Sequence, residues 1–301
     1  MLNDYSKLHQ QGVVTDMEPI RLAVNGRTDI GQVREENEDS IRWHSDSSHP
    51  FAYVIVADGM GGYSGGAMAS QIAADTLQQH LNELLGDTFL SCSPQQQQLM
   101  LRAALIEAIG NANQRIVETK NTRPQFSQMG TTLVAAVVWQ EFLVVAHIGD
   151  SRAYLWNAYG LQRLTRDHSV VQEMIDSGQL TPEQAQQSQI RNHITRALGV
   201  TEDAEPVINS WKLTEDALLL LCSDGLTEYL DDHCIERVLA THRPALESVY
   251  RFIDDANQLG GRDNISAGIM EFSNRPEAVA RAVDDAITLK PKKDDVTVRK
   301  S

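Results

Sequence analysis

Cysteine is scarce in this sequence of 301 residues, and the few that occur exclude a disulfide scaffold. Cys92, Cys222 and Cys234 stand at irregular spacing and form no C-x-x-C pair. Such a pattern favours a reducing compartment over secretion.

Basic residues and long apolar runs are also in short supply. The chain has 26 Lys and Arg against 41 Asp and Glu, a formal net charge of −15. This charge argues against nucleic acid or an anionic membrane as a partner. The longest apolar runs, 133–139 and 217–222, fall far short of the ~20 residues of a membrane-spanning helix, and residues 1–16 lack the apolar stretch of a signal peptide. We therefore predict a soluble, cytoplasmic monomer.

Apolar residues recur with two different periods. Helical spacing predicts long helices at 67–85 and 95–118, and we expect the second to bury one side composed of Leu99, Ala103, Ile106, Ile109 and Ile116. Short apolar, β-branched runs predict strands at 51–57, 131–139, 142–148, 217–222 and 265–272. The two-residue link Gln140-Glu141 predicts a hairpin. Antiparallel hairpins together with long helices indicate an α+β layered fold.

The organisation along the chain predicts one compact domain with two appendages. Residues 1–19 form a polar N-terminal extension, and residues 20–273 the domain itself. Within it, the polar stretch at about 165–198 is interpreted as a surface flap. Residues 274–301 are predicted to form a C-terminal helix and a charged tail.

Acidic residues stand beside the predicted strands. Asp58, Asp150 and Asp224 each follow a strand, Asp263 precedes the last strand, and Glu38-Asp39 precede a short strand at 40–43. Carboxylates that converge at a sheet edge repel one another unless cations compensate them. Oxygen ligands without a His or Cys pair favour magnesium or manganese over zinc or copper. An Asp-Gly pair after a strand is also a common turn, so spacing alone leaves a structural reading open.

The residues of five motifs are more specific than the spacing of the acids, because in this order the motifs resemble those of the type 2C protein phosphatases. These are metal-dependent serine/threonine phosphatases, and the likeness to bacterial members covers about residues 20–272. The motifs are Arg34-Glu35-Glu36-Asn37-Glu38-Asp39-Ser40, Asp58-Gly59-Met60-Gly61-Gly62, Gly149-Asp150-Ser151-Arg152, Ser223-Asp224-Gly225-Leu226 and Gly261-Arg262-Asp263-Asn264-Ile265.

The resemblance implies a fold, a reaction and partners. The fold would be a central antiparallel β-sandwich flanked by helices, in four layers α-β-β-α. The reaction would be hydrolysis of phosphoserine and phosphothreonine on proteins by a hydroxide bridging two divalent cations, with two or three Mn²⁺ or Mg²⁺ bound. Phosphorylated proteins, a cognate serine/threonine kinase among them, would be the partners.

The resemblance also implies roles for the metal ligands. Asp58 matches the carboxylate that bridges two metals, with the backbone carbonyl of Gly59 as a further ligand. Asp224 and Asp263 match ligands of the first metal, and Glu38 matches the residue that contacts the second through water.

The resemblance implies roles for three further residues, and at a fourth position the sequence departs from many members of the family. Asp39 would orient a metal-bound water, Asp150 would hold a third, weaker metal, and Arg34 would bind phosphate. Met60 stands where many eukaryotic members have a histidine that acts as general acid. Methionine cannot donate a proton, so the acid stays unassigned, with metal-bound water as the favoured candidate.

The sequence lacks the motifs of other classes of phosphatase. No cysteine is followed by the C-x₅-R pattern of cysteine-based phosphatases, and the nine histidines form no metallophosphatase motif. We interpret His147 as a core residue and expect His168 and His193 to face solvent. A catalytically inactive binding module of the same fold remains the alternative, although such a protein should have lost matched positions, and none is lost here.

Overall fold

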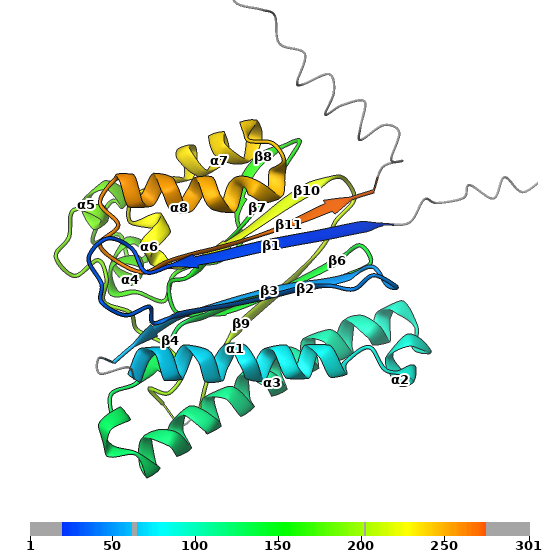
Figure 1. The fold of residues 1–301 in the computed structure, drawn as a ribbon, viewed down its shortest axis with the longest axis horizontal. Helices are drawn as coiled ribbons and strands as arrows, with labels where there is room; N and C mark the ends of the chain where they lie inside the picture. The colour runs from blue at the N-terminus through cyan, green and yellow to red at the C-terminus, as the bar shows by residue number, and fades with distance from the viewer. Residues whose placement is uncertain (1–19, 62–64, 202, 275–301) are drawn as a thin grey trace, which may run out of the picture.

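Two antiparallel sheets packed face to face form the centre of the protein, with helices on both outer faces (Figure 1). The computed structural model describes residues 20–61, 65–201 and 203–274. The predicted α+β fold of four layers is confirmed. The predicted tail helix after residue 274 lies outside the described residues.

The first sheet joins the beginning of the domain to its end. Its order is β1-β11-β10-β7-β8, so the first strand pairs with the last. These strands are β1 (Arg21–Asp29), β7 (Arg152–Asn157), β8 (Gly160–Arg163), β10 (Ala217–Cys222) and β11 (Ile265–Ser273).

The second sheet has the order β2-β3-β5-β6-β9, and a short strand β4 also pairs with β3. The strands are β2 (Asp39–Ser45), β3 (Phe51–Met60), β4 (Gly130–Thr131), β5 (Leu133–Trp139), β6 (Phe142–Ile148) and β9 (Val207–Lys212). The predicted hairpin is present, since Trp139 pairs with Phe142 across Gln140-Glu141.

Each sheet is covered by its own helices (Figure 1). On the second sheet lie α1 (Gly65–Glu83), α2 (Asp87–Leu90) and α3 (Pro94–Thr122); on the first lie α6 (Asp224–Thr227), α7 (Asp232–Thr241) and α8 (Ser248–Gln258). The connection from β8 to β9 contains α4 (Val170–Asp176) and α5 (Pro182–Gln186). None of the helices in the described part of the chain is long and apolar enough to cross a membrane.

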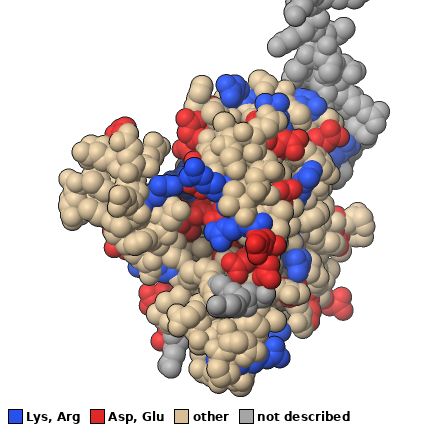
Figure 2. Space-filling view, turned by 60° about the vertical axis from the view of Figure 1, so that its left-hand side comes forward, with Lys and Arg blue, Asp and Glu red and all other residues tan. Residues whose placement is uncertain are grey.

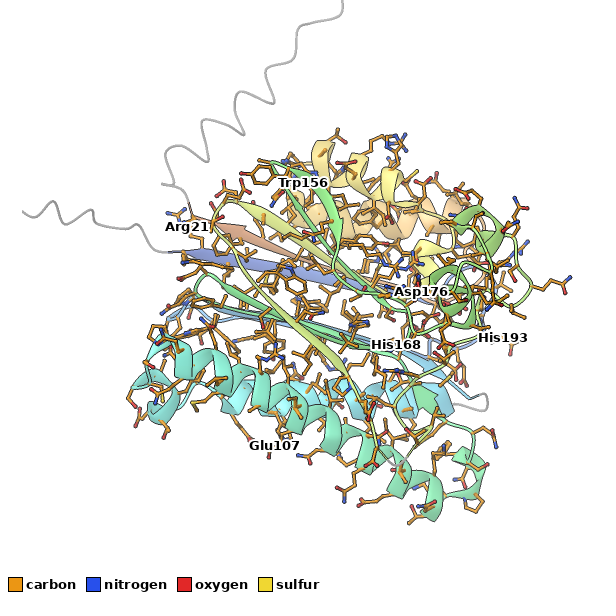
Figure 3. The ribbon with its side chains drawn as sticks, turned by 180° about the vertical axis from the view of Figure 1, so that it is seen from behind. Arg21, Glu107, Trp156, His168, Asp176 and His193 are labelled. Carbon is orange, nitrogen blue, oxygen red and sulfur yellow. The ribbon has the colours of Figure 1, made fainter. Side chains whose placement is uncertain are left out.

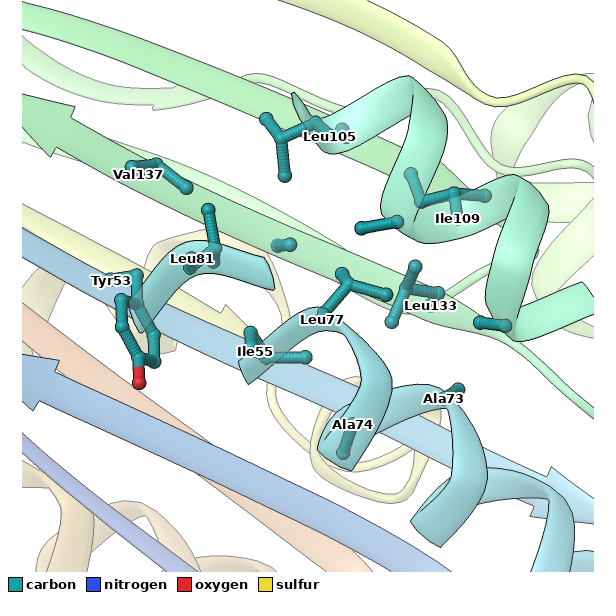
Figure 4. Packing of buried hydrophobic residues seen from close by; sticks show 14 of the residues in the cluster. Tyr53, Ile55, Ala73, Ala74, Leu77, Leu81, Leu105, Ile109, Leu133 and Val137 are labelled. Carbon is teal, nitrogen blue, oxygen red and sulfur yellow. The ribbon is translucent and has the colours of Figure 1, made fainter. Parts of the chain in front are cut away.

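The continuous apolar run at the start of β3 is explained by burial on both faces. Tyr53 and Ile55 pack toward α1 and α3, as Figure 4 shows, whereas Val54 and Val56 pack into the layer between the sheets. Because successive side chains of a strand point to opposite faces, a strand sandwiched between two apolar layers needs no polar positions. The same holds for β5 and β10.

The predicted buried side of α3 is partly wrong. Ile109 and Ile116 are buried as expected, but Leu99 is 67% exposed and Ile106 is also exposed. Leu101 and Leu105 face the core instead. The helix has apolar residues on more than one face, and only the face that contacts α1 and the sheet is buried.

Two leucines of α3 therefore provide a matched pair for a stability test. Leu105→Ala should lower the free energy of unfolding by about 2–5 kcal/mol, because it leaves a cavity in a closed apolar layer. Leu99→Ala should change it by no more than about 0.5 kcal/mol, since that side chain is exposed. Urea denaturation of both variants measures the difference, and equal losses would show that the buried face is misassigned.

Candidate metal centre

The acidic residues identified in the sequence gather at one end of the sandwich. Asp39 begins β2 and Asp58 lies near the end of β3, where the two are direct cross-strand partners. From the other sheet, Asp224 follows β10 and Asp263 precedes β11. Figure 2 shows acidic side chains in a recess on this face, with basic side chains beside them. Residues from both sheets thus meet at one place.

Asp39 connects the two sheets. Its Oδ2 accepts hydrogen bonds from Ser223 Oγ at 2.8 Å and from Ser266 Oγ at 2.7 Å. Both serines belong to the opposite sheet or its immediate extension. Burial raises the pKa of Asp39 to about 7 against the lowering effect of these bonds. The sequence motifs include Ser223 without giving it a role and do not include Ser266, because only the tertiary fold brings the two serines to Asp39.

Asp58 stands at the centre of the acidic cluster, which we define as Asp39, Asp58, Asp150, Asp224 and Asp263. Burial raises the pKa of Asp58 well above its usual range, and the charges of Asp39, Asp224 and Asp150 raise it further. A hydrogen bond between the Asp58 and Asp224 carboxyls favours the protonated form of Asp58. Side chains directly opposite on an antiparallel pair lie about 5 Å apart, so the repulsion between Asp39 and Asp58 is built into the strand register.

Asp150 and Asp224 experience the same environment. Burial followed by repulsion from Asp224 raises the pKa of Asp150 to about 8. Burial followed by repulsion from Asp263 raises the pKa of Asp224. Carboxylates placed so close together without compensating positive charge resist ionisation.

Thr132 links two of the segments that carry these acids. Its backbone N–H donates to the Asp58 carbonyl at 2.8 Å, and the Asp58 N–H donates to its Oγ1 at 3.2 Å. The same hydroxyl lies 2.8 Å from Ser151 Oγ, next to Asp150. Thr132 therefore sets the position of Asp58 relative to Asp150, a role that no pattern in the sequence signals.

Glu38 lies where strand β3 meets the beginning of α1. One of its carboxylate oxygens accepts a hydrogen bond from Gly66 N at 3.1 Å, and its carbonyl accepts one from Gly59 N at 3.2 Å. A Cβ at Gly59 would lie 2.2 Å from the Gly66 carbonyl oxygen, and one at Gly66 would lie 2.6 Å from Glu38 Oε1. Both positions require glycine, because strand, helix and carboxylate approach one another so closely.

Arg34 reaches this site from the loop between β1 and β2. Its guanidinium donates to Asp263 Oδ2 at 2.8 Å, and its side chain is 48% exposed. Repulsion among the acids is therefore relieved at Asp263 by a basic group that lies 229 residues away in sequence.

Comparison with known proteins identifies the family of the chain. Residues 31–265, most of the chain, match the family described as protein phosphatase 2C. The chain belongs to that family.

Relatives of the phosphatase support the assignment at the level of both sequence and fold. The chain is 36% identical over 246 residues to the serine/threonine phosphatase stp of Listeria monocytogenes. This match covers 81% of this chain and 94% of that protein. The crystal structure of the serine/threonine phosphatase PstP/Ppp of Mycobacterium tuberculosis aligns with a TM-score of 0.72 and 32% identity, covering 84% of this chain and 99% of that chain. The catalytic domain of PstP in complex with two manganese ions aligns with a TM-score of 0.71 and 31% identity, over 84% and 99% of the two chains. The protein is a serine/threonine phosphatase by family.

The donor set of the phosphatase fits hard divalent cations. The cluster offers carboxylate oxygens, and burial together with repulsion between the acids raises the pKa values of Asp39, Asp58 and Asp150, a penalty that bound cations would relieve. Among the described residues, however, no three His, Cys, Asp or Glu side chains enclose one point tightly enough to hold an ion alone. Magnesium commonly keeps several waters and uses one or two carboxylates, so backbone oxygens and water would complete the coordination.

The histidines of the phosphatase do not all behave as expected. His147 is buried in β6, as predicted. His168, expected to face solvent, instead stacks on His147 with ring centroids 4.9 Å apart, and its Nδ1 accepts a hydrogen bond from Gly149 N at 3.1 Å. His193 is exposed. Figure 3 shows His168 and His193 at the end of the sandwich opposite Arg21.

A cavity of about 820 Å³ adjoins Asp150 and Asp224 in the phosphatase. It extends between residues 169–192, which include α4 and α5, and the region of α6 and α7. An ion pair between Arg191 and Glu228, 2.7 Å apart, connects the two walls. The site therefore opens sideways into a polar groove large enough for several residues of a polypeptide.

Proposed function

We propose that this phosphatase hydrolyses phosphoserine and phosphothreonine on proteins at two divalent cations, Mn²⁺ or Mg²⁺. The observation that carries the proposal is the convergence of Asp39, Asp58, Asp150 and Asp224 at one end of the sandwich, with Arg34 beside them. The two manganese ions in the PstP catalytic domain support the number of cations.

Each carboxylate would have its own part in holding the cations. Asp58 would bridge both, together with the carbonyl oxygen of Gly59. Asp224 and Asp263 would bind the first, and Glu38 would contact the second through water. Asp150, on the loop after β6, would bind a third and weaker cation.

Two cations held by these residues would lower the pKa of water bound to them, and so would supply hydroxide near neutral pH. Asp39 would orient that water. Its second oxygen is free for this role because Oδ2 accepts the hydrogen bonds from Ser223 and Ser266.

Arg34 would bind the phosphate oxygens. Its bond to Asp263 uses one of the five N–H donors of a guanidinium, so donors remain for a bidentate contact with phosphate. Such a contact stabilises the negative charge of the transferring phosphoryl group. The thioether of Met60 has no proton to give, so the leaving serine or threonine oxygen must be protonated by another group.

The groove beside Asp150 and Asp224 favours a polypeptide substrate over a small phosphate ester, because it leaves room for residues that flank the phosphorylated side chain. A serine/threonine kinase and its targets would supply such substrates. No observation favours the inactive binding module.

The proposal is tested with phosphopeptides. In the presence of Mn²⁺, the protein should release phosphate from phosphoserine and phosphothreonine peptides, and EDTA should abolish the release. Arg34→Ala should lower kcat/KM by about 10²-fold, because a donor to the transition state is lost.

Arg42→Ala is the matched control, since Arg42 forms an ion pair with Asp75 on α1 at 2.7 Å. That variant should retain activity within about twofold, as expected for a surface ion pair of little energetic weight. Hydrolysis that persists in EDTA would contradict the proposal, and binding of phosphopeptides without hydrolysis would point to the inactive module.

A further inference from the structure

Asn264 is a buried asparagine next to the acidic cluster, and its side chain uses both donors and its acceptor on backbone groups. It lies between Asp263 and the first residue of β11 and is 4% exposed. Its Nδ2 donates to the carbonyl oxygens of Ile30 at 3.0 Å and Glu36 at 2.9 Å. Its Oδ1 accepts from the N–H of Glu38 at 2.8 Å.

These three bonds all end on one loop, residues 30–38, which carries Arg34. Ile30 lies at the beginning of the loop, and Glu36 and Glu38 lie near its end, so one side chain connects both ends. The middle of the loop is held at Gln32, whose N–H donates to the Gly261 carbonyl at 2.6 Å. Arg34 itself is half exposed. The direction of its guanidinium therefore depends on the backbone that Asn264 holds.

The bonding pattern at this position suits a primary amide. Aspartate would place an acceptor where two carbonyl oxygens need a donor, and leucine would leave three partly buried hydrogen bonds unmade. A buried polar group that loses its partner is costly. The neighbouring Asp263 binds the Arg34 guanidinium directly, so two consecutive residues hold the loop and its arginine.

We propose that Asn264 is a positioning residue for phosphate binding, acting through Arg34. The proposal rests on the phosphate-binding role proposed for Arg34. Asn264 fixes the conformation of residues 30–38, so that Arg34 presents its donors to phosphate without an entropic cost of ordering the loop. Its loss should weaken phosphate binding more than it weakens the fold.

Asn113 provides the matched control, since it is a buried asparagine that holds a different loop. It lies on α3, its Oδ1 accepts from Gly199 N at 2.7 Å, and its Nδ2 donates to the Thr201 carbonyl at 3.0 Å. Asn113→Ala should lower the melting temperature to an extent comparable to Asn264→Ala, without the effect on phosphate.

Three measurements test the proposal. The inhibition constant of inorganic phosphate, measured at saturating Mn²⁺, should rise about tenfold in Asn264→Ala and stay within about twofold in Asn113→Ala. Hydrogen exchange of residues 30–38, measured on metal-free protein, should accelerate in Asn264→Ala alone. In an Arg34→Ala background, adding Asn264→Ala should raise the constant by less than about twofold, because residues that act as one unit are not additive.

The possible outcomes separate the two proposals. If Arg34→Ala leaves the phosphate constant unchanged, the proposed function of Arg34 fails. If Arg34→Ala raises it but Asn264→Ala behaves like Asn113→Ala, or acts equally in the Arg34→Ala background, the role of Asn264 is overturned. Should Asn264→Ala not fold, Asn264→Ser, which retains one donor, is measured instead and should change the same quantities in the same direction by a smaller factor.

Discussion

Replacing Asp58 with asparagine should abolish phosphatase activity while preserving the fold. We expect kcat to fall by at least about 10³-fold at saturating Mn²⁺, because the residue proposed to bridge both cations loses its charge. The melting temperature of the metal-free protein should not fall, since the substitution removes a carboxyl group whose ionisation is opposed by burial and by Asp39, Asp224 and Asp150. Steady-state kinetics on a phosphopeptide and a thermal melt in EDTA measure the two effects.

Asp75→Asn is the control for this substitution. Asp75 lies on α1, where it binds Arg42 at 2.7 Å and takes no part in the acidic cluster. The control should keep kcat within about twofold. An Asp58→Asn enzyme that retains a tenth of the activity would contradict the proposed bridging role.

Without cations, the free energy of unfolding should fall as the pH rises above neutrality. Asp39 and Asp150 have pKa values of about 7 and about 8 in the folded protein, whereas the unfolded chain has the usual value near 4. Between those values the folded protein binds more protons, so the free energy of unfolding falls as pH rises. Buried His147 and His168 have lowered pKa values and act in the opposite direction below about pH 6.5. The acids therefore dominate above that pH.

We expect the metal-free protein to lose about 2 kcal/mol between pH 6.5 and 8.5, or roughly 4–8 °C in Tm. Mn²⁺ should raise the Tm more at pH 8.5 than at pH 6.5, because protons compete with it for the same carboxylates. Differential scanning fluorimetry in EDTA and in Mn²⁺ measures both curves. A metal-free Tm that rises steadily to pH 8.5 would show that the acids are not held in a repulsive cluster.

The layered fold was predictable from the sequence because its strands and helices carry distinct patterns. The apolar runs at 51–57 and 217–222 have no polar position, which a strand buried on both faces allows. β1 was not predictable from an apolar run, because it is a partly buried strand with a polar sequence. Its partner β11 lies at the other end of the domain in sequence. The buried face of α3 was only partly predictable, since Leu99 and Leu105 are equally apolar and only packing distinguishes them.

The acidic residues of the candidate site were all identified from their positions beside strands and their motifs, but their environment was not. Asp58 was expected after its strand and lies within it, directly opposite Asp39. That register makes two carboxylates neighbours on one face of the sheet, and spacing along the chain cannot reveal it.

Local order along the chain was thus enough to indicate the fold class, the family resemblance and the acids that carry the proposed chemistry, because periodicity and short motifs are properties of neighbouring residues. The tertiary structure alone decided which groups hold those acids in place. Ser223 and Ser266 on Asp39, Thr132 between Asp58 and Asp150, and Asn264 on the Arg34 loop each act across long sequence separations. Their hydrogen bonds join segments that only the folded chain brings together, which is the physical reason that the motifs containing Ser223 and Asn264 do not reveal these contacts.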